Sequence, residues 1–462
     1  MGLDTMETNG TVTEQLGKFV SELQYRNIPP EVLEKARACL LNAYGVGIGS
    51  NHLPYAPLAC RAVIDRDGVQ PGGATIFGDG RKTTMSGAAL VNAVLFHGRT
   101  QEDFTWGSTH AGVVIVPALT ALIEAKALPV TRLLEALVAG YEVAIALDHA
   151  YASRLTENKF RGTPIFGALG TAAAVARLYG LSAGQTAAAL AYAAATTGGN
   201  LESQSEGSDE WRYQVGVHAG VGLTAAHLAK AGALAAARAF EGSAGFVRAF
   251  VRADCDLAAV TGKLGKEWSI MNVFFKPYPV PAWNQTPVEL ALEMRGQIAG
   301  RSLRQVDVRM NPYEINYPGK NSGGPFENAT SAKLSIAFAV ATTLAHGVPT
   351  FDLLLDFRNE KTMRVLEKIR LVPDPAVPRL CCGIRIHCED DSVIDSYLAK
   401  TGADYSFDCD EVSRLVRGIG KETGVPDVAY DRLDDFVRKL PHGGEIQAVI
   451  DSFALMPKMI GA

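Results

Sequence analysis

Segments with the apolar spacing of α-helices follow one another through the first 270 residues of the chain. Ala and Gly recur at helix-face spacing between residues 165 and 230, and such small side chains let helix backbones approach one another closely. This pattern favours a buried all-α core or a subunit interface over a solvated surface. The expected helices are Val12–Leu23, Pro30–Ile48, Ser86–Phe96, Gly112–Ala127, Val130–Ala152, Pro164–Leu178, Ala183–Thr197, Gly216–Ala231 and Ala233–Phe250.

The character of the sequence changes after Trp268. Phe274–Pro281 carries prolines at positions 277, 279 and 281 and cannot form a regular helix. We expect strands at Gln305–Met310, Leu380–His387 and Val393–Leu398, the last two joined by a turn, and a long loop at Asn311–Asn328 followed by helix Ser331–His346. Helix returns at Asp410–Leu440.

These patterns predict a mainly α fold with two domains. A large all-α helical domain would be formed by both chain ends, residues 1–270 and 400–462, and a smaller α+β lid domain, residues 271–399, would be inserted between them. Clefts between domains are favoured places for small-molecule sites.

Charge and hydropathy exclude several classes of partner. Charged residues make up 20 % of the chain and the mean hydropathy is +0.07, which is typical of a folded protein. The net charge of −5 and a pI near 6.0 give no electrostatic footprint for nucleic acid or an anionic membrane. The apolar run Ala111–Ile123 is too short to span a bilayer. The polar N-terminus shows no secretory signal.

The seven cysteines are scattered and form no CxxC pair. Cys381, Cys382, His387 and Cys388 are the only local grouping, but they lie on an alternating run whose side chains would take opposite faces. We therefore expect reduced thiols, no metal site and a cytoplasmic location.

A polar segment between two expected helices, His97–Ala118, concentrates groups that carry chemistry. It holds the acids Glu102 and Asp103, an aromatic residue and His110 just before the apolar helix that begins at Gly112. The free N–H groups and the dipole of a helix N-terminus attract negative charge. This combination is typical of a site for an anionic substrate.

Two later helix starts also place a cation beside free backbone N–H groups. Arg161 precedes Thr163-Pro164, a good N-cap and first helical residue, and Arg212 lies in the segment before Gly216. Lys276 adds a cation on the proline-rich segment, where it could stabilise an enolate or act as a base. If these helix starts converge, they predict a cleft that binds carboxylates or phosphates.

Nucleotide-binding and nucleophile motifs are absent from the sequence. There is no GxGxxG after an expected strand, no Walker A pattern and no GxSxG elbow. We therefore expect chemistry without a cofactor.

Four blocks of the sequence resemble those of one protein family. They are HGRTQEDFTWGSTHAGVVIVPALTALIEA, FRGTPIFGALGTAAAVARLYGLSAGQTAAAL, YQVGVHAGVGLTAAHLAKAG with EGSAGF after it, and FKPYPVPAWNQTPVELAL. Their order resembles that of MmgE/PrpD proteins, which include 2-methylcitrate dehydratase, cis-aconitate decarboxylase and iminodisuccinate epimerase. The resemblance implies an all-α domain made of both termini, a smaller lid domain, a homodimer and no cofactor.

The resemblance also implies which residues do chemistry. His110, Lys276 and Asp103 match residues of the family's motifs, but other positions depart from the pattern. Arg161 and Gln285 stand where such proteins have His, Trp211 where they have Lys, Phe338 where they have Tyr, and Thr100 where they have an acid. A guanidinium stays charged, whereas an imidazole shuttles protons near neutrality, so we expect a substrate that differs from those of the usual members.

We therefore predict a cofactor-independent enzyme that transfers a proton at the carbon α to a carboxylate or carbonyl of a small anionic or carbonyl-bearing substrate. A lyase reaction, dehydration or decarboxylation, is the leading hypothesis; the alternatives are an isomerase or epimerase and a non-catalytic binding protein. His110 or Lys276 would be the base. The predicted catalytic residues are His110, Lys276 and Asp103, and the predicted substrate-binding residues are Arg161, Arg212, Trp106, Thr105, Tyr278 and Gln285.

Overall fold

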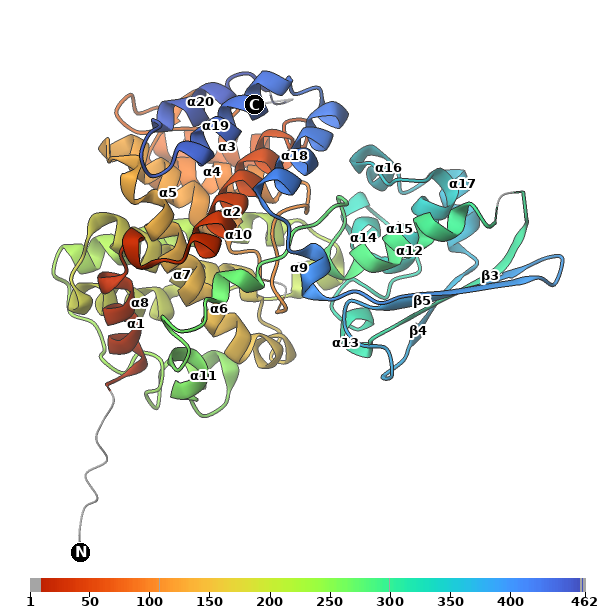
Figure 1. The fold of residues 1–462 in the computed structure, drawn as a ribbon, viewed down its shortest axis with the longest axis horizontal. Coiled ribbons are helices and arrows are strands. Elements are labelled where there is room, and N and C mark those ends of the chain that lie inside the picture. Colours follow the sequence, from red (N-terminus) through yellow and green to blue (C-terminus); the bar gives the residue numbers. More distant parts are fainter. Residues whose placement is uncertain (1–9, 108, 299, 458, 460–462) are drawn as a thin grey trace, which may run out of the picture.

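The computed structural model describes residues 10–107, 109–298, 300–457 and 459, which form two lobes side by side (Figure 1). We call the larger lobe the helical body and the other the smaller lobe. The helical body contains α1 (Val12–Glu22), α2 (Pro30–Ile48), α3 (Tyr55–Asp67), α4 (Met85–His97), α5 (Gly112–Lys126), α6 (Leu133–Glu157), α7 (Gly162–Tyr179), α8 (Ala183–Thr196), α9 (Glu202–Glu206), α10 (Glu210–Lys230), α11 (Leu257–Thr261), α18 (Cys409–Thr423), α19 (Asp427–Lys439) and α20 (Ile446–Phe453), with a short hairpin of β1 (Ala74–Thr75) and β2 (Lys82–Thr83). The smaller lobe contains α12 (Gln285–Arg295), β3 (Leu303–Met310), α13 (Pro312–Ile315), α14 (Ala329–Leu334), α15 (Ile336–His346), α16 (Phe351–Leu355), α17 (Glu360–Leu366), β4 (Ile369–Pro373), β5 (Cys382–Cys388) and β6 (Val393–Leu398).

One apolar core runs through the helical body and takes side chains from both ends of the chain, among them Leu16 of α1 and Phe436 of α19. Its central helices touch through small residues. A Cβ built on Gly170 of α7 would lie 2.7 Å from the carbonyl oxygen of Gly140 on α6, so the two backbones are in contact. The prediction of a mainly α protein is confirmed.

The smaller lobe is built on a four-stranded sheet in the order β4-β3-β5-β6. β3 pairs with β4 in parallel and with β5 in antiparallel, and β5 and β6 form the expected hairpin with Ile386 opposite Ile394. Leu290 of α12 and Val340 of α15 pack with Val306 and Ile384 of the sheet in a second apolar core. β4 lacked a strand prediction.

Several of the expected helices differ in the structure. The helix expected at Gly216–Ala231 begins earlier, at Glu210, so Arg212 lies in its first turn rather than before its start. The prediction of a helix at Ala233–Phe250 is wrong: the chain there forms turns and a single π-helical turn, Val247–Val251. Its Ala-rich part has little apolar surface to bury, and Leu234 is 95 % exposed. The helix expected at Ser331–His346 is broken at Ser335 into α14 and α15. The helix expected at Asp410–Leu440 is interrupted between α18 and α19, where Pro426 follows Gly424.

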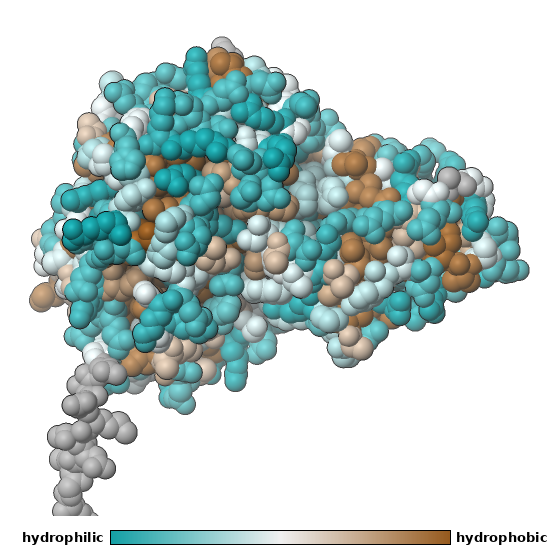
Figure 2. All heavy atoms as spheres, in the orientation of Figure 1, coloured by the Kyte–Doolittle hydropathy of each residue, from teal (hydrophilic) through white to brown (hydrophobic). Residues whose placement is uncertain are grey.

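Hydrophilic side chains cover most of the face drawn in Figure 2, with hydrophobic patches mainly over the smaller lobe. Within the described ranges, no helix is both long and apolar enough to cross a membrane.

Candidate active site

A short antiparallel bridge brings two distant segments of the chain together. Phe104 follows α4 in the polar segment, and its backbone pairs with that of Phe274, with N–H to O distances of 2.9 and 2.8 Å. The two segments run in opposite directions, so the residue two positions before Phe104 lies opposite the residue two positions after Phe274. Both side chains point to the same side of the bridge. This register places Glu102 opposite Lys276.

The carboxylate of Glu102 is the centre of the resulting cluster. Its Oε1 accepts a hydrogen bond from Nζ of Lys276 at 2.8 Å, and it lies 3.2 Å from Nδ1 of His97 and 3.7 Å from Nδ1 of His110. Burial raises the pKa of Glu102, but the charge of Lys276, together with the imidazoles of His97 and His110 that face the carboxylate, outweighs this effect and holds the pKa well below its usual range. Glu102 is therefore an anion at neutral pH.

Lys276 is fully buried beside this anion. Its ammonium also donates to the carbonyl of Thr100 at 3.1 Å. Burial lowers the pKa of Lys276, while the charge of Glu102 opposes that shift. With an ionised carboxylate at 2.8 Å, the side chain is well placed to remain an ammonium.

The ring of His110 is held in one tautomer. Its Nδ1 lies 2.7 Å from the backbone carbonyl oxygen of Asp103, and a carbonyl can only accept, so Nδ1 carries the proton. Burial and the charge of Lys276 lower the pKa of His110 well below its usual value, so the ring is neutral. Its Nε2 then has a free lone pair, and among the described residues this atom has no hydrogen-bond partner.

His97 is also fixed as a neutral Nδ1–H tautomer. Its Nε2 lies 2.9 Å from the guanidinium of Arg161, which can only donate, so the proton sits on Nδ1 and faces Glu102. Burial lowers the pKa of His97 to about 4. Arg161 also donates to the carbonyl of Trp211 and to Gln214, so its two terminal nitrogens already contact protein acceptors.

The N-terminus of α5 is occupied by the protein's own carboxylate. Both oxygens of Asp103 lie 3.3 Å from the N–H of Gly112, and Tyr141 donates to Oδ2 at 2.5 Å. Burial raises the pKa of Asp103 to about 6. The expected anion site at this helix start is therefore filled by Asp103 itself. α7 begins at Gly162 with Arg161 as N-cap, two residues before the expected start at Pro164, and Thr163 accepts from the N–H of His110.

Arg212 lies against two aromatic rings near the cluster. Its guanidinium carbon is 3.9 Å from the ring centre of Tyr55 and 4.0 Å from that of Trp211, whose ring in turn packs edge-on against His97. Arg212 also donates to the carbonyl of Gly98. One terminal nitrogen of Arg212 and the indole nitrogen of Trp211 are buried donors without a partner in the described part of the chain.

The smaller lobe contributes two further buried ammonium groups. Lys333 of α14 donates to the carbonyl of Arg99 at 3.0 Å and lies over the ring of Phe351. Lys320 precedes α14 and is 3 % exposed. Burial lowers the pKa of both lysines well below the usual value, and the charge of Lys276 adds to the shift at Lys320.

The structure thus brings His110, Asp103, Lys276, Arg161 and Arg212 into one contiguous buried cluster, which we call the Glu102 cluster. It does not bring all the predicted residues there. Thr105 donates to Asp148 at 2.7 Å, which braces the loop before His110. Trp106 packs edge-on against Phe274.

Tyr278 and Gln285 contact each other rather than the Glu102 cluster. The amide of Gln285 accepts from the N–H of Tyr278 at 3.1 Å and donates to the carbonyls of Tyr278 and Val280. Gln285 therefore holds the proline-rich turn in shape, and its role in substrate binding stays a prediction.

Sequence reasoning assigned no role to His97, Lys320 or Lys333. His97 ends α4 and resembles any histidine at a helix C-terminus, although it stands five residues before Glu102. The two lysines belong to a loop and a short helix whose position over the helical body only the fold reveals. Cys381, Cys382 and Cys388, the local cysteine grouping of the sequence, are free thiols.

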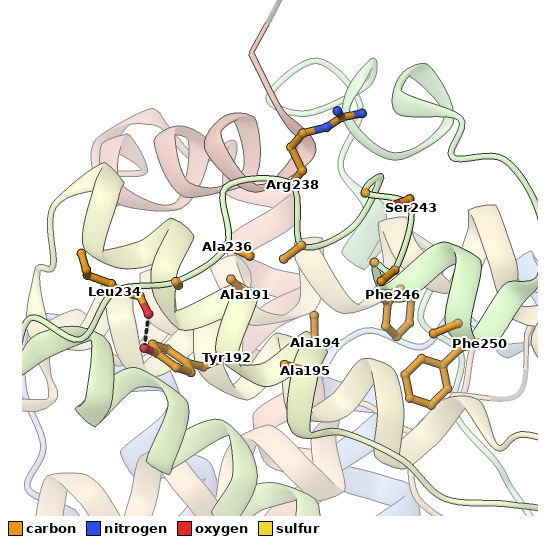
Figure 3. Close-up of a pocket in the computed structure, with 16 residues that line it drawn as sticks. Ala191, Tyr192, Ala194, Ala195, Leu234, Ala236, Arg238, Ser243, Phe246 and Phe250 are labelled. Atoms are coloured by element: carbon orange, nitrogen blue, oxygen red, sulfur yellow. Dashed lines mark hydrogen bonds between the residues drawn. The ribbon is translucent and has the colours of Figure 1, made fainter.

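No group of three His, Cys, Asp or Glu side chains could hold a metal ion within the ranges that the structure describes. A separate groove of about 560 Å³ lies between α8 and the loop that leads to Phe250 (Figure 3). Ala and Gly dominate its lining, and the hydroxyl of Tyr192 donates across it to the carbonyl of Leu234. The groove shares no lining residue with the Glu102 cluster.

Two family models match the chain. The MmgE/PrpD N-terminal domain matches residues 14–257, and the MmgE/PrpD C-terminal domain matches residues 278–402. The chain belongs to the MmgE/PrpD family. The N-terminal match carries Glu102, His110, Arg161 and Arg212, and the C-terminal match begins two residues after Lys276.

Individual MmgE/PrpD relatives are distant in sequence but match over most of their length. A cis-aconitate decarboxylase-like protein of Aspergillus oryzae is 25 % identical over 472 residues, 96 % of this chain and 97 % of that protein. The cis-aconitate decarboxylase of Aspergillus terreus is 24 % identical over 353 residues, 72 % of this chain and 71 % of that enzyme. Human cis-aconitate decarboxylase is 25 % identical over 404 residues, 82 % of this chain and 81 % of that enzyme.

Proposed function

We propose that this MmgE/PrpD protein is a lyase that decarboxylates or dehydrates a small di- or tricarboxylic acid in the Glu102 cluster. The observation that carries the proposal is the state of His110: a buried, neutral imidazole with its proton held on Nδ1 and a free lone pair on Nε2. An imidazole so held can exchange a proton with a substrate carbon. The names of the relatives, cis-aconitate decarboxylases, support the class of reaction and substrate.

His110 would be the proton-transfer residue. In a dehydration, Nε2 takes the proton from the carbon α to a carboxylate, the C–O bond of the next carbon breaks, and the hydroxyl group leaves as water with the proton that the imidazolium returns. In a decarboxylation, the carbon–carboxyl bond breaks, CO₂ leaves, and the imidazolium delivers a proton to the carbon that keeps the electron pair. A bound anion raises the pKa of His110 toward the range needed for both steps, and Glu102, 3.7 Å from Nδ1, stabilises the imidazolium.

Lys276 would stabilise negative charge rather than act as the base. Its ammonium is paired with an ionised carboxylate, so it is a poor proton acceptor, whereas His110 is neutral. Charge that develops on a substrate carboxylate as its neighbouring carbon loses a proton would be held by this ammonium. The buried, unpartnered donors of Arg212 and Trp211 would bind a second carboxylate.

The test is product analysis by ¹H NMR in D₂O with a panel of small acids that includes cis-aconitate, citrate, malate and succinate. We expect one acid to be consumed, either with loss of CO₂ and deuterium entering at the carbon that lost its carboxyl group, or with loss of water and formation of a double bond. His110→Asn should slow this about 10²- to 10⁴-fold, the usual weight of general acid–base catalysis. His149, an exposed histidine on α6, supplies the control His149→Asn, which should leave the rate unchanged. An unchanged rate in His110→Asn would overturn the role of His110.

An isomerase or epimerase is the second candidate. Arg161 and Gln285 stand where the resemblance leads us to expect imidazoles. Their side chains donate hydrogen bonds to other groups of the protein and offer no proton to a leaving group. An isomerisation needs proton transfer but no leaving group. In the same NMR experiment, deuterium entry without loss of CO₂ or water would favour this candidate, and binding without any exchange would favour a non-catalytic protein. The homodimer and the cytoplasmic location stay predictions.

A further inference from the structure

Lys320 has the least satisfied ammonium group in the neighbourhood of the Glu102 cluster. Lys320 is only 3 % exposed, yet its side chain makes no hydrogen bond or ion pair with any described residue. A buried ammonium without a partner costs several kcal/mol, so such a group persists where something else repays the cost. By contrast, Lys276 pairs with Glu102, and Lys333 donates to the carbonyl of Arg99.

The backbone around Lys320 is held by hydrogen bonds, and these fix the buried position of its side chain. Its N–H donates to the carbonyl of Tyr317 at 3.0 Å, and its carbonyl accepts from the N–H of Ile336 at the start of α15 at 3.0 Å. Gly319 has a φ of +79°, and a Cβ there would lie 2.5 Å from the carbonyl oxygen of Gln204 on α9. The turn before Lys320 is therefore pressed against the helical body.

The Glu102 cluster and the lysines beside it hold more buried cations than anions. The ammonium of Lys320 is close enough to that of Lys276 for the two charges to repel each other. Arg161, Arg212 and Lys333 are each at most 3 % exposed, and the counter-charge at the centre comes from Glu102. This excess of buried donors is complementary to a ligand with more than one negative charge.

We propose that Lys320 binds a carboxylate of the substrate, so that the smaller lobe supplies one contact and the helical body supplies the reacting groups. The inference rests on the proposed function and adds to it a contact from the smaller lobe: one carboxylate of the substrate lies at Lys276 beside His110, and another reaches across the lobe boundary to Lys320. The same contact couples substrate binding to the docking of the smaller lobe on α9.

The experiment compares the full chain with Lys320→Met, Lys320→Arg and Lys361→Met. Lys361 is an exposed lysine of α17 in the same lobe and provides the matched control. Each protein is titrated with citrate by calorimetry and unfolded thermally with and without citrate. Removing one partner of a buried charge pair weakens binding strongly, so we expect Lys320→Met to raise the Kd for citrate about 30-fold or more. Lys320→Arg, which keeps the charge, should bind more tightly than Lys320→Met, and Lys361→Met should match the wild type.

The unliganded proteins discriminate a binding role from a structural one. Because Lys320→Met replaces a buried polar amine, which has no side-chain partner among the described residues, with an apolar side chain, its melting temperature without citrate should equal or exceed that of the wild type, while the rise on adding citrate should be lost. A variant that fails to fold or melts lower without citrate would overturn the inference, and so would an unchanged Kd. If the wild type turns over an acid while Lys320→Met keeps its Kd, only the role of Lys320 fails. A wild type that neither binds citrate nor consumes any acid overturns the proposed function as well.

Discussion

Replacing Glu102 by Gln should damage both the fold and the chemistry, because one carboxylate serves Lys276 and two histidines. Two opposite charges 2.8 Å apart interact by ~6 kcal/mol at an effective dielectric constant of about 20. Desolvation offsets part of this, and breaking a buried pair by removing one partner costs about 3–5 kcal/mol. We expect Glu102→Gln to lower the free energy of unfolding by about 3 kcal/mol at pH 7. This value is at the lower end of that range because Lys276, once it has lost its partner, can release its proton.

The pH dependence gives this prediction a sign. The pKa of Glu102 is held well below its ordinary value of 4.5, so its stabilising contribution is fully present above pH 4.5 and is lost as pH falls through the lowered pKa. The difference between wild type and variant should therefore be full at pH 6–8 and shrink in acid. Activity should fall about 10²- to 10³-fold, since the charged network around His110 is broken.

Urea unfolding followed by circular dichroism, with the rate measured by NMR, is the assay. Glu289→Gln is the matched control, because Glu289 pairs with Lys400 at 2.7 Å but both side chains are partly exposed, 24 % and 18 %. A partly exposed ion pair contributes at most about 1 kcal/mol to the free energy of unfolding, and this pair lies outside the Glu102 cluster. Equal stability losses in the two variants, or full activity in Glu102→Gln, would refute the reasoning.

Two further substitutions test the structure around the cluster. Burial raises the pKa of Asp103 to about 6, so the folded state favours the protonated form, and the stability that this form contributes is lost as pH rises through 6. Asp103→Asn should therefore gain stability relative to wild type as pH rises from 4 to 7 in thermal melts. A difference that does not vary with pH would contradict this. Gly170→Ala should lower the free energy of unfolding in urea by about 1–3 kcal/mol, because the new Cβ would lie 2.7 Å from the carbonyl of Gly140. Gly184→Ala on α8 has open space around it and should be neutral or stabilising. Equal effects of the two substitutions would show that α6 and α7 do not need their close contact.

The parts of the fold that follow from local pattern were predictable. Helices such as α2 and α5 bury nearly all their side chains and show it in long apolar runs, and the β5–β6 hairpin shows two-residue alternation around a turn. The segment Ala233–Phe250 is rich in Ala and therefore has a high helix propensity, yet it offers too little apolar surface to bury, and the predicted helix does not form.

The Glu102 cluster was predictable only in part. His110 and the acids are close in sequence, and the proline-rich segment that holds Lys276 is conspicuous. The pairing of Glu102 with Lys276 depends on the Phe104–Phe274 bridge, which joins residues 170 positions apart, as 274 − 104 gives. Local sequence does not encode such a register. The same holds for Lys320, whose burial depends on how the smaller lobe packs on α9.

The central claim is that the cluster holds His110 as a neutral imidazole with its proton on Nδ1 and a free Nε2. The most direct measurement is a ¹⁵N NMR titration of histidine-labelled protein from pH 5 to 8, with His110 assigned by comparison with His110→Asn. Because burial and Lys276 lower the pKa of His110 well below 6.5, we predict an unprotonated Nε2 and a protonated Nδ1 throughout this range. Protonation of His110 within this range, or the opposite tautomer, would contradict the account.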